Sequence, residues 1–184
     1  IFDCDFYTGD DSVAIKSGKN PEGNAVNRPS RNIRVFDCRC HSGHGITVGS
    51  EMSGGVEDVF VWDCELSGSN FGVEIKGTKK RGGYVRNVHI RNCRMPRIMM
   101  HSVRYNDDGI GAPTAPVFEN CLFEEVCLTG RVHKSDGEIV DCNVLDLYGF
   151  DVPGHEIRNV VLRNVTVESS LDSPARMAFA LCEG

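Results

Sequence analysis

The sequence has few aromatic residues, 8% of its 184 positions, and no apolar run near the ~18 residues that a membrane-spanning helix needs. It also lacks an excess of positive charge, because 20 Lys and Arg face 26 Asp and Glu for a net charge of −6. These features exclude a membrane-spanning helix and argue against nucleic acid and anionic membranes as partners. Neither a starting Met nor a signal peptide is visible, and Ile1 already begins a strand-like run. We therefore expect residue 1 to lie inside a longer fold.

Metal-binding cysteine pairs are missing too. None of the nine cysteines forms a Cys-x-x-Cys pair, and Cys38 and Cys40 are the closest two. We therefore expect no metal site and no cofactor. The 20 glycines favour a β-rich, turn-rich chain over a helical bundle, and the length suits one domain over residues 1–184.

A four-residue phrase recurs seven times: an apolar residue, any residue, Asp or Asn, then Cys or Val. Its copies end in steps of 34, 26, 29, 28, 21 and 23 residues, at Cys4, Cys38, Cys64, Cys93, Cys121, Cys142 and Val165. A loose period of this size is typical of a solenoid.

Short strand-like runs accompany the phrase. Period-2 alternation precedes several copies, as in Asn87-Val88-His89-Ile90, and a second run follows in residues 12–16, 45–48, 72–76 and 125–129. The steps leave no room for a helix beside these strands. The pattern predicts an all-β parallel β-helix of about seven coils, with strands stacked ~4.8 Å apart.

The phrase also gives the cysteines a structural interpretation. At one position per coil, those that end the phrase would form a column of buried, inert thiols, continued by Val165. A disulfide framework is the alternative, supported by the cysteine count alone. The preceding Asp or Asn is interpreted as turn chemistry, since short polar side chains bond to local backbone.

Polar insertions interrupt the repeat. Residues 20–30, with two prolines, are predicted to project as a loop that can wall a groove, and residues 79–83 and 106–115 form two further loops.

Two adjacent carboxylates, Asp10 and Asp11, stand at a turn before a strand. Because two ionised carboxylates side by side repel, one is expected to hold a proton while the other stays charged. One protonated and one ionised carboxyl are what general acid and general base catalysis require. A solvated Asp-rich turn is the alternative.

The next two coils carry further polar groups at the corresponding place. Stacking puts His44 beside the Asp pair, where it can hydrogen-bond a carboxylate, and the glycines that flank it would let a substrate approach. One coil on, Glu74 and Lys76 alternate with apolar residues and are expected to face the same way, with Lys76 able to bind an acidic sugar. An ordinary surface histidine and a solvated strand face are the alternatives.

Taken together, Gly9-Asp10-Asp11, Gly43-His44-Gly45 and Val73-Glu74-Ile75-Lys76 resemble the signature blocks of the polygalacturonases, family 28 of the glycoside hydrolases. Residues 8–18 and 43–56 resemble the bacterial exo-acting members. The resemblance is specific over the first 110 residues and architectural beyond them.

This resemblance implies a right-handed parallel β-helix that hydrolyses α-1,4 bonds between galacturonic acid units in pectin with inversion. It implies Asp10 as the general acid, Asp11 as a carboxylate that activates water, and His44 as support for the acid. Lys76 would bind a substrate carboxylate, and Tyr105 would line the same subsite. Inversion requires a water held between the base and the sugar.

The sequence departs from this family at two points. The family has a third aspartate about one coil before the Asp pair, upstream of residue 1, so the chain as given is expected to lack part of the base machinery and its first coils. Glu74 stands where the family usually has Arg, which argues for a different uronic acid linkage or a decorated pectin fragment. Basic residues would still give the groove positive charge: Lys76, Lys79, Lys80, Arg81 and Arg104.

Two other functions fit part of the pattern. A calcium-dependent pectate lyase could use Asp10 and Asp11 as ligands but gives His44 no role, and a non-catalytic β-helix would bind carbohydrate without turnover. The sequence does not decide endo from exo action. We expect a secreted or periplasmic monomer whose partner is a pectic polysaccharide or oligogalacturonide.

Overall fold

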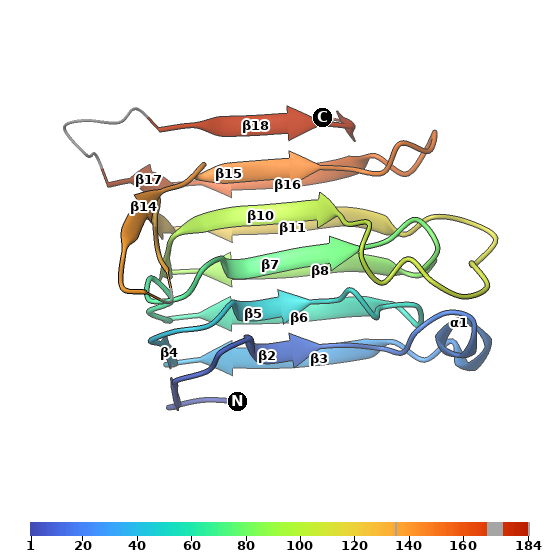
Figure 1. The fold of residues 1–184 in the computed structure, drawn as a ribbon, viewed down its shortest axis with the longest axis horizontal. Helices are drawn as coiled ribbons and strands as arrows, with labels where there is room; N and C mark the ends of the chain where they lie inside the picture. The colour runs from blue at the N-terminus through green and yellow to red at the C-terminus, as the bar shows by residue number, and fades with distance from the viewer. Residues whose placement is uncertain (135, 169–174, 184) are drawn as a thin grey trace.

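The computed structural model describes residues 1–134, 136–168 and 175–183. Its two largest sheets have six parallel strands each and lie one behind the other (Figure 1). The sheet nearer the viewer, called the front sheet, runs in the order β18-β15-β10-β7-β5-β2. Its strands are β2 (Asp11–Ile15), β5 (Gly45–Val48), β7 (Gly72–Gly77), β10 (Arg97–Ser102), β15 (Leu145–Tyr148) and β18 (Met177–Ala180).

The back sheet runs in the order β19-β16-β11-β8-β6-β3. Its strands are β3 (Ser30–Phe36), β6 (Val56–Trp62), β8 (Tyr84–Arg91), β11 (Val117–Glu124), β16 (Ile157–Arg163) and β19 (Cys182–Glu183). Each front strand leads into a back strand of the same coil, so the chain winds as a right-handed parallel β-helix. The predicted fold class is confirmed.

Shorter elements complete the coils. A third side is made by β1 (Asp5–Phe6) paired with β4 (Arg39–Cys40), and by β9 (Arg94–Met95), β12 (Cys127–Leu128) and β17 (Thr166–Val167). The hairpin of β13 (Arg131–His133) and β14 (Ile139–Asp141) is antiparallel. The insertion at residues 20–30 holds the short helix α1 (Glu22–Val26).

The core consists of apolar side chains stacked coil on coil. In the front sheet the inward residues Val13, Ile46, Val73, Ile98 and Leu145 are register neighbours and are buried. Period-2 alternation puts their polar neighbours on the outer face, which is where the predicted site residues lie. None of the described helices is long and apolar enough to cross a membrane.

The turn interpretation of the Asp and Asn residues is confirmed where the residue follows a back strand, but not for Asn120, inside β11, or Asp141, inside β14. Asp37, Asp63, Asn92 and Asn164 have φ between 48° and 54°, the left-handed region that short polar side chains tolerate best. Each ends a back strand and turns the chain into the next side of the coil.

All nine cysteines are free thiols, so the disulfide alternative is wrong. Cys38, Cys64 and Cys93 are buried, each directly after one of these turns. Thiols of one coil contact the backbone of the coil before, as Cys93 Sγ does at 3.9 Å from the Val61 carbonyl. Burial raises the pKa of Cys121 to about 12 and that of Cys40 to about 11, which suppresses the reactive thiolate.

Three assignments within the repeat are wrong. Cys121 follows Asn120 in the middle of β11 and pairs in register with Val88, so it is not in the column of Cys93. Cys142 follows the antiparallel hairpin, and residues 125–129 contribute β12 to the third side rather than a front strand. The count of about seven coils rested on these phrases and is not confirmed.

Candidate active site

Asp10, Asp11 and His44 meet at the start of two adjacent front strands. The turn before β2 is held by Thr8 Oγ1, which donates to the Asp10 carbonyl at 2.9 Å, and the backbone N–H of His44 donates to the same carbonyl at 2.9 Å. His44 Nδ1 then lies 2.9 Å from Asp10 Oδ1 and 3.3 Å from Asp11 Oδ1. The predicted juxtaposition of the histidine with both carboxylates is therefore present.

The glycines around His44 are needed for packing against the neighbouring coils, and their role in substrate approach stays a prediction. Gly43 has φ of 79°, and a Cβ there would collide with the Thr8 side chain and the Asp10 carbonyl. Gly45 has φ of 96°, and its Cβ would collide with the Gly72 carbonyl. Both positions face the neighbouring coils rather than open space.

The two carboxylates have different surroundings. The Asp10 side chain is 84% exposed, whereas that of Asp11 is 14% exposed. Asp11 Oδ1 accepts a hydrogen bond from Thr47 Oγ1 at 2.8 Å and lies 3.9 Å from Lys76 Nζ. Asp11 thus faces a hydroxyl donor and an ammonium, whereas the side chain of Asp10 is open to solvent and to a ligand.

Glu74 and Lys76 form a buried ion pair one coil further. Lys76 Nζ lies 2.8 Å from Glu74 Oε2, outside hydrogen-bond geometry, and His101 Nε2 lies 2.8 Å from Glu74 Oε1. Burial disfavours the charge on Glu74, but His101 and Lys76 outweigh it and hold the pKa of Glu74 below its usual value. Burial likewise opposes the charge on Lys76, yet the Glu74 carboxylate raises the pKa of Lys76.

Tyr105 lies beside this pair. It follows β10 in the loop of residues 103–116 and is 52% exposed, with its ring centroid 6.0 Å from Lys76 Nζ. The structure thus brings together all five predicted site residues: Asp10, Asp11, His44, Lys76 and Tyr105.

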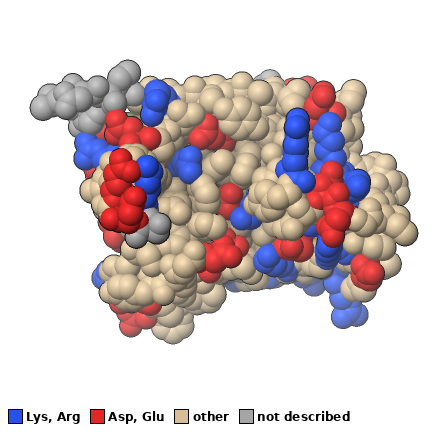
Figure 2. Space-filling view, in the orientation of Figure 1, with Lys and Arg blue, Asp and Glu red and all other residues tan. Residues whose placement is uncertain are grey.

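One of the five basic residues predicted to give the groove positive charge, Arg81, is misplaced by that prediction. Arg81 is fully buried, where Nε donates to the Ser50 carbonyl and Nη2 to the Asn106 carbonyl, each at 2.8 Å. It fixes loops and does not face the groove. Lysines and arginines are interspersed with carboxylates over this face rather than forming one positive field (Figure 2).

Three residues of the site escaped the sequence reasoning. Thr47 bonds Asp11, His101 bonds Glu74, and Phe71 lies against the His44 ring at a centroid distance of 5.2 Å. Thr47 and His101 are register partners of Glu74 and Lys76, respectively. Applying the outward-facing pattern of β7 to the strand before it and the strand after it would have identified both residues.

Asp10, Asp11 and His44 also form a possible metal-ligand set, since their donor atoms lie within 4.8 Å of one another. The ammonium of Lys76 lies 3.9 Å from Asp11, so a bound cation would compete with it for this carboxylate.

The nearest carboxyl oxygens of Asp10 and Asp11 are within this same 4.8 Å. Inverting glycosidases usually separate their two carboxyl groups by roughly 6.5–9.5 Å, so that a water fits between base and sugar. The Asp pair alone therefore provides an acid and a nearby carboxylate, without the usual space for the attacking water.

Comparison with known proteins matches residues 1–142 to the family described as "Glycosyl hydrolases family 28". A "Probable polygalacturonase" of Vitis vinifera is 39% identical over 97 residues, which cover 52% of this chain and 20% of the relative. An "Endo-polygalacturonase" of Pectobacterium parmentieri is 38% identical over 91 residues, covering 50% of this chain and 21% of the relative.

Among solved structures, an exopolygalacturonase of Thermotoga maritima superimposes with a TM-score of 0.74 and 24% identity. The match covers 89% of this chain and 35% of that one. At this identity the likeness supports the β-helix fold. The chain thus spans about a fifth of the length of the curated relatives named here.

Proposed function

The chain belongs to the glycosyl hydrolases of family 28, and we propose that it supplies the acid–base centre of a pectin-degrading polygalacturonase. The observation that carries this proposal is the contact of His44 Nδ1 with Asp10 at 2.9 Å and Asp11 at 3.3 Å, beside the ammonium of Lys76. The substrate is a pectic chain of galacturonosyl units, cleaved at α-1,4 linkages. The protein acts outside the cytoplasm, secreted or periplasmic, as a monomer.

In the proposed mechanism the exposed carboxyl of Asp10 and the less exposed carboxylate of Asp11 have different roles. Asp10, the solvated carboxyl, protonates the leaving glycosidic oxygen, and His44 holds it in place. Asp11, held by Thr47 and the Lys76 ammonium, acts as a base on the attacking water. Because Asp10 and Asp11 are close together, the water needs a further carboxylate, which the family resemblance assigns to an aspartate upstream of residue 1.

The pairing of Glu74 with Lys76 affects which substrate the site prefers. The Glu74 carboxylate neutralises much of the Lys76 charge, and it is itself held by His101. Lys76 therefore attracts a substrate carboxylate less strongly than an unpaired lysine would. The proposed substrate is accordingly a pectic segment in which the sugar at this subsite is decorated or differently linked, rather than plain homogalacturonan.

The experiment that tests this function uses the complete protein and polygalacturonate in EDTA. We expect new reducing ends without the ultraviolet absorbance of an unsaturated product, with higher rates on decorated pectic oligosaccharides. Cleavage that needs calcium and yields unsaturated ends would support a lyase instead. Binding without any new reducing ends across a pectic panel would support a carbohydrate-binding module.

The stereochemical course provides a separate check. We expect the first-formed product to be the β-anomer, since inversion at an α-linkage gives that configuration, and proton NMR within the first minutes of reaction detects it. A first-formed α-anomer would mean retention, the outcome that the short Asp10–Asp11 separation taken alone would favour.

A further inference from the structure

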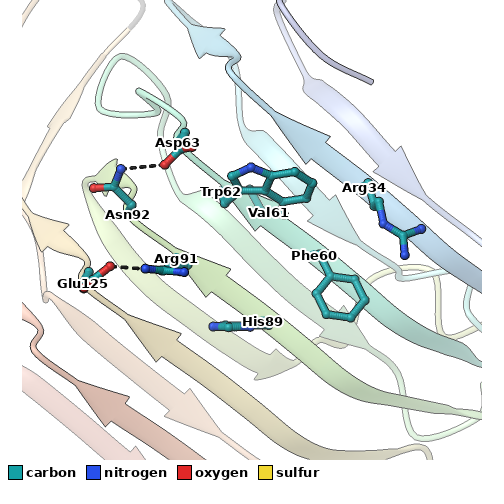
Figure 3. A pocket seen from close by; sticks show the side chains of 9 residues that line it. All are labelled: Arg34, Phe60, Val61, Trp62, Asp63, His89, Arg91, Asn92 and Glu125. Atoms are coloured by element: carbon teal, nitrogen blue, oxygen red, sulfur yellow. Dashed lines mark hydrogen bonds and ion pairs between the residues drawn. The ribbon is translucent and has the colours of Figure 1, made fainter.

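A hollow of about 610 Å³ opens on the outer face of the back sheet, away from the acid–base centre on the front sheet (Figure 3). Its size falls within the range of small-molecule sites, about 300–1,000 Å³. Residues of β3, β6 and β8 and of the turns that follow β6 and β8 line it, among them Arg34, Phe60, Trp62, Asp63, Arg91 and Asn92. None of these residues takes part in the mechanism proposed above.

The floor of the hollow is one face of the Trp62 indole. Its other face stacks on Phe36, with ring centroids 4.5 Å apart and planes 8° from parallel. In the following coil the register partner of Trp62 is Arg91, whose guanidinium turns away to Glu125 at 3.0 Å. Among the described residues no cation–π contact joins Arg91 to the indole, and Trp62 lines the hollow.

Polar groups of opposite kinds stand on the two sides of the indole (Figure 3). On one side Arg34 lies over the Phe60 ring at 5.6 Å, and no carboxylate of the described residues lies within 4.0 Å of its guanidinium. On the other side Asn92 Nδ2 donates to Asp63 Oδ1 at 2.6 Å. The hollow thus has an apolar floor, a cation at one end and hydrogen-bonding groups at the other.

We propose that this hollow binds one acidic sugar unit of a polysaccharide, at a second site remote from the cleaved bond. The apolar C–H face of a pyranose ring packs against the electron-rich face of an indole. Its carboxylate would pair with Arg34, whose planar guanidinium matches carboxylate geometry, while its hydroxyls bond to Asp63 and Asn92. The choice of a pectic uronate rests on the proposed function, and the site would hold the polymer on the enzyme between cleavage events.

Intrinsic fluorescence reports this site directly, because Trp62 is the one tryptophan of the 184 residues. The complete protein would carry Asp10→Asn to prevent turnover, and a matched Trp62→Phe protein would provide the background to subtract. Titration with trigalacturonate should change the Trp62 emission saturably. In Arg34→Gln the concentration for half-saturation should rise at least about tenfold, as expected for loss of a charged hydrogen bond.

Arg31→Gln is the control, since Arg31 lies on the same strand, is exposed and does not line the hollow. It should shift half-saturation less than about twofold, as is usual for a charge that makes no direct contact. Trp62 emission that does not respond to trigalacturonate would overturn the proposal. So would equal effects of Arg31→Gln and Arg34→Gln, or equal half-saturation by neutral galactotriose.

This test is independent of the catalytic proposal. Turnover is measured with Asp10 intact, and binding at Trp62 with Asp10 replaced. Binding without turnover in the intact protein would overturn the proposed function alone, and turnover without a Trp62 response would overturn the second site alone.

Discussion

The front and back sheets are built from the same coils, yet their charged pairs differ in exposure to water. On the front sheet Glu74 and Lys76 are paired with side-chain exposures of 2% and 10%. On the back sheet Glu57 pairs with Arg86 at 2.6 Å, and the arginine side chain is 42% exposed. Charges that water cannot screen interact strongly with one another and with a ligand, whereas solvated pairs interact weakly.

In this fold the front sheet carries the candidate active site, and the back sheet carries charged pairs that face water. Back-sheet charges alternate along the stack, with arginines next to glutamates at the same register, as in Arg158 with Glu119 at 2.8 Å. Such pairs keep an outer sheet face hydrated. On the front sheet Asp11, Glu74 and Lys76 are largely buried and interact with one another, and Asp10 beside them is exposed, so the charged groups differ in environment as functional sites often require.

The largest expected effect follows from Asp10→Asn in the complete protein. Removing a general acid costs typically 10²–10⁴-fold in rate, so kcat on a pectic substrate should fall by about 10³-fold with folding unchanged. Asp37→Asn is the matched control, because Asp37 is exposed at a turn where Asn serves equally well in other coils. A loss below tenfold for Asp10→Asn would assign the acid role to another group.

A second prediction concerns stability. Glu74→Gln leaves the buried Lys76 without its nearest anion, and we expect the free energy of unfolding to fall by about 3 kcal/mol in urea titrations. Glu57→Gln removes the matched back-sheet partner and should cost less than about 1 kcal/mol. Equal losses in the two variants would mean that the two sheet faces do not differ in this way.

A smaller effect is expected when pH is varied. The lowered pKa of Glu74 means that its stabilising contribution is present above its ordinary value of 4.5 and is lost as pH falls through the folded value. The raised pKa of Lys76 means that its contribution is full below 10.5 and is lost as pH rises through the folded value. The stability gap between the parent and Glu74→Gln should therefore be flat across neutral pH.

Urea titrations over a pH series would measure this gap, with a decline expected only in acid below 4.5 and in strong alkali. A gap that already narrows near neutral pH would contradict the assignment of this stabilisation to the Glu74–Lys76 pair.

The sequence predicted which side chains would lie together, because a residue at the same place in successive coils of a β-helix stacks on its neighbours. Strands that repeat once per coil stack in register, so Asp11, His44 and Lys76 had to meet once the strand starts were known. The roles of these residues came from the family resemblance. Their mutual contacts with Thr47 and His101 required the register, which no single strand reveals.

The repeat itself was harder to assign. Five of the six back strands, all but β19, contain one left-handed residue and are followed by a second, as with Asn87 and Asn92 in and after β8. In the coil of β11 the second such residue is Glu125, which is neither Asp nor Asn and so does not match the phrase. The first left-handed residue, Asn120, does match it, and the repeat was therefore assigned to the wrong position. Arg81 was misjudged because its partners lie on loops, whose paths local sequence does not determine.

The measurement that tests the contrast between the faces most directly is kcat/KM for Lys76→Gln and Arg86→Gln in the complete protein, with thermal melting as a check of folding. Each variant removes one cation from a glutamate pair, one on either sheet. We predict a loss of about 100-fold for Lys76→Gln, corresponding to about 2.7 kcal/mol, and less than about twofold for Arg86→Gln. Similar kcat/KM values for the two folded variants would contradict the account.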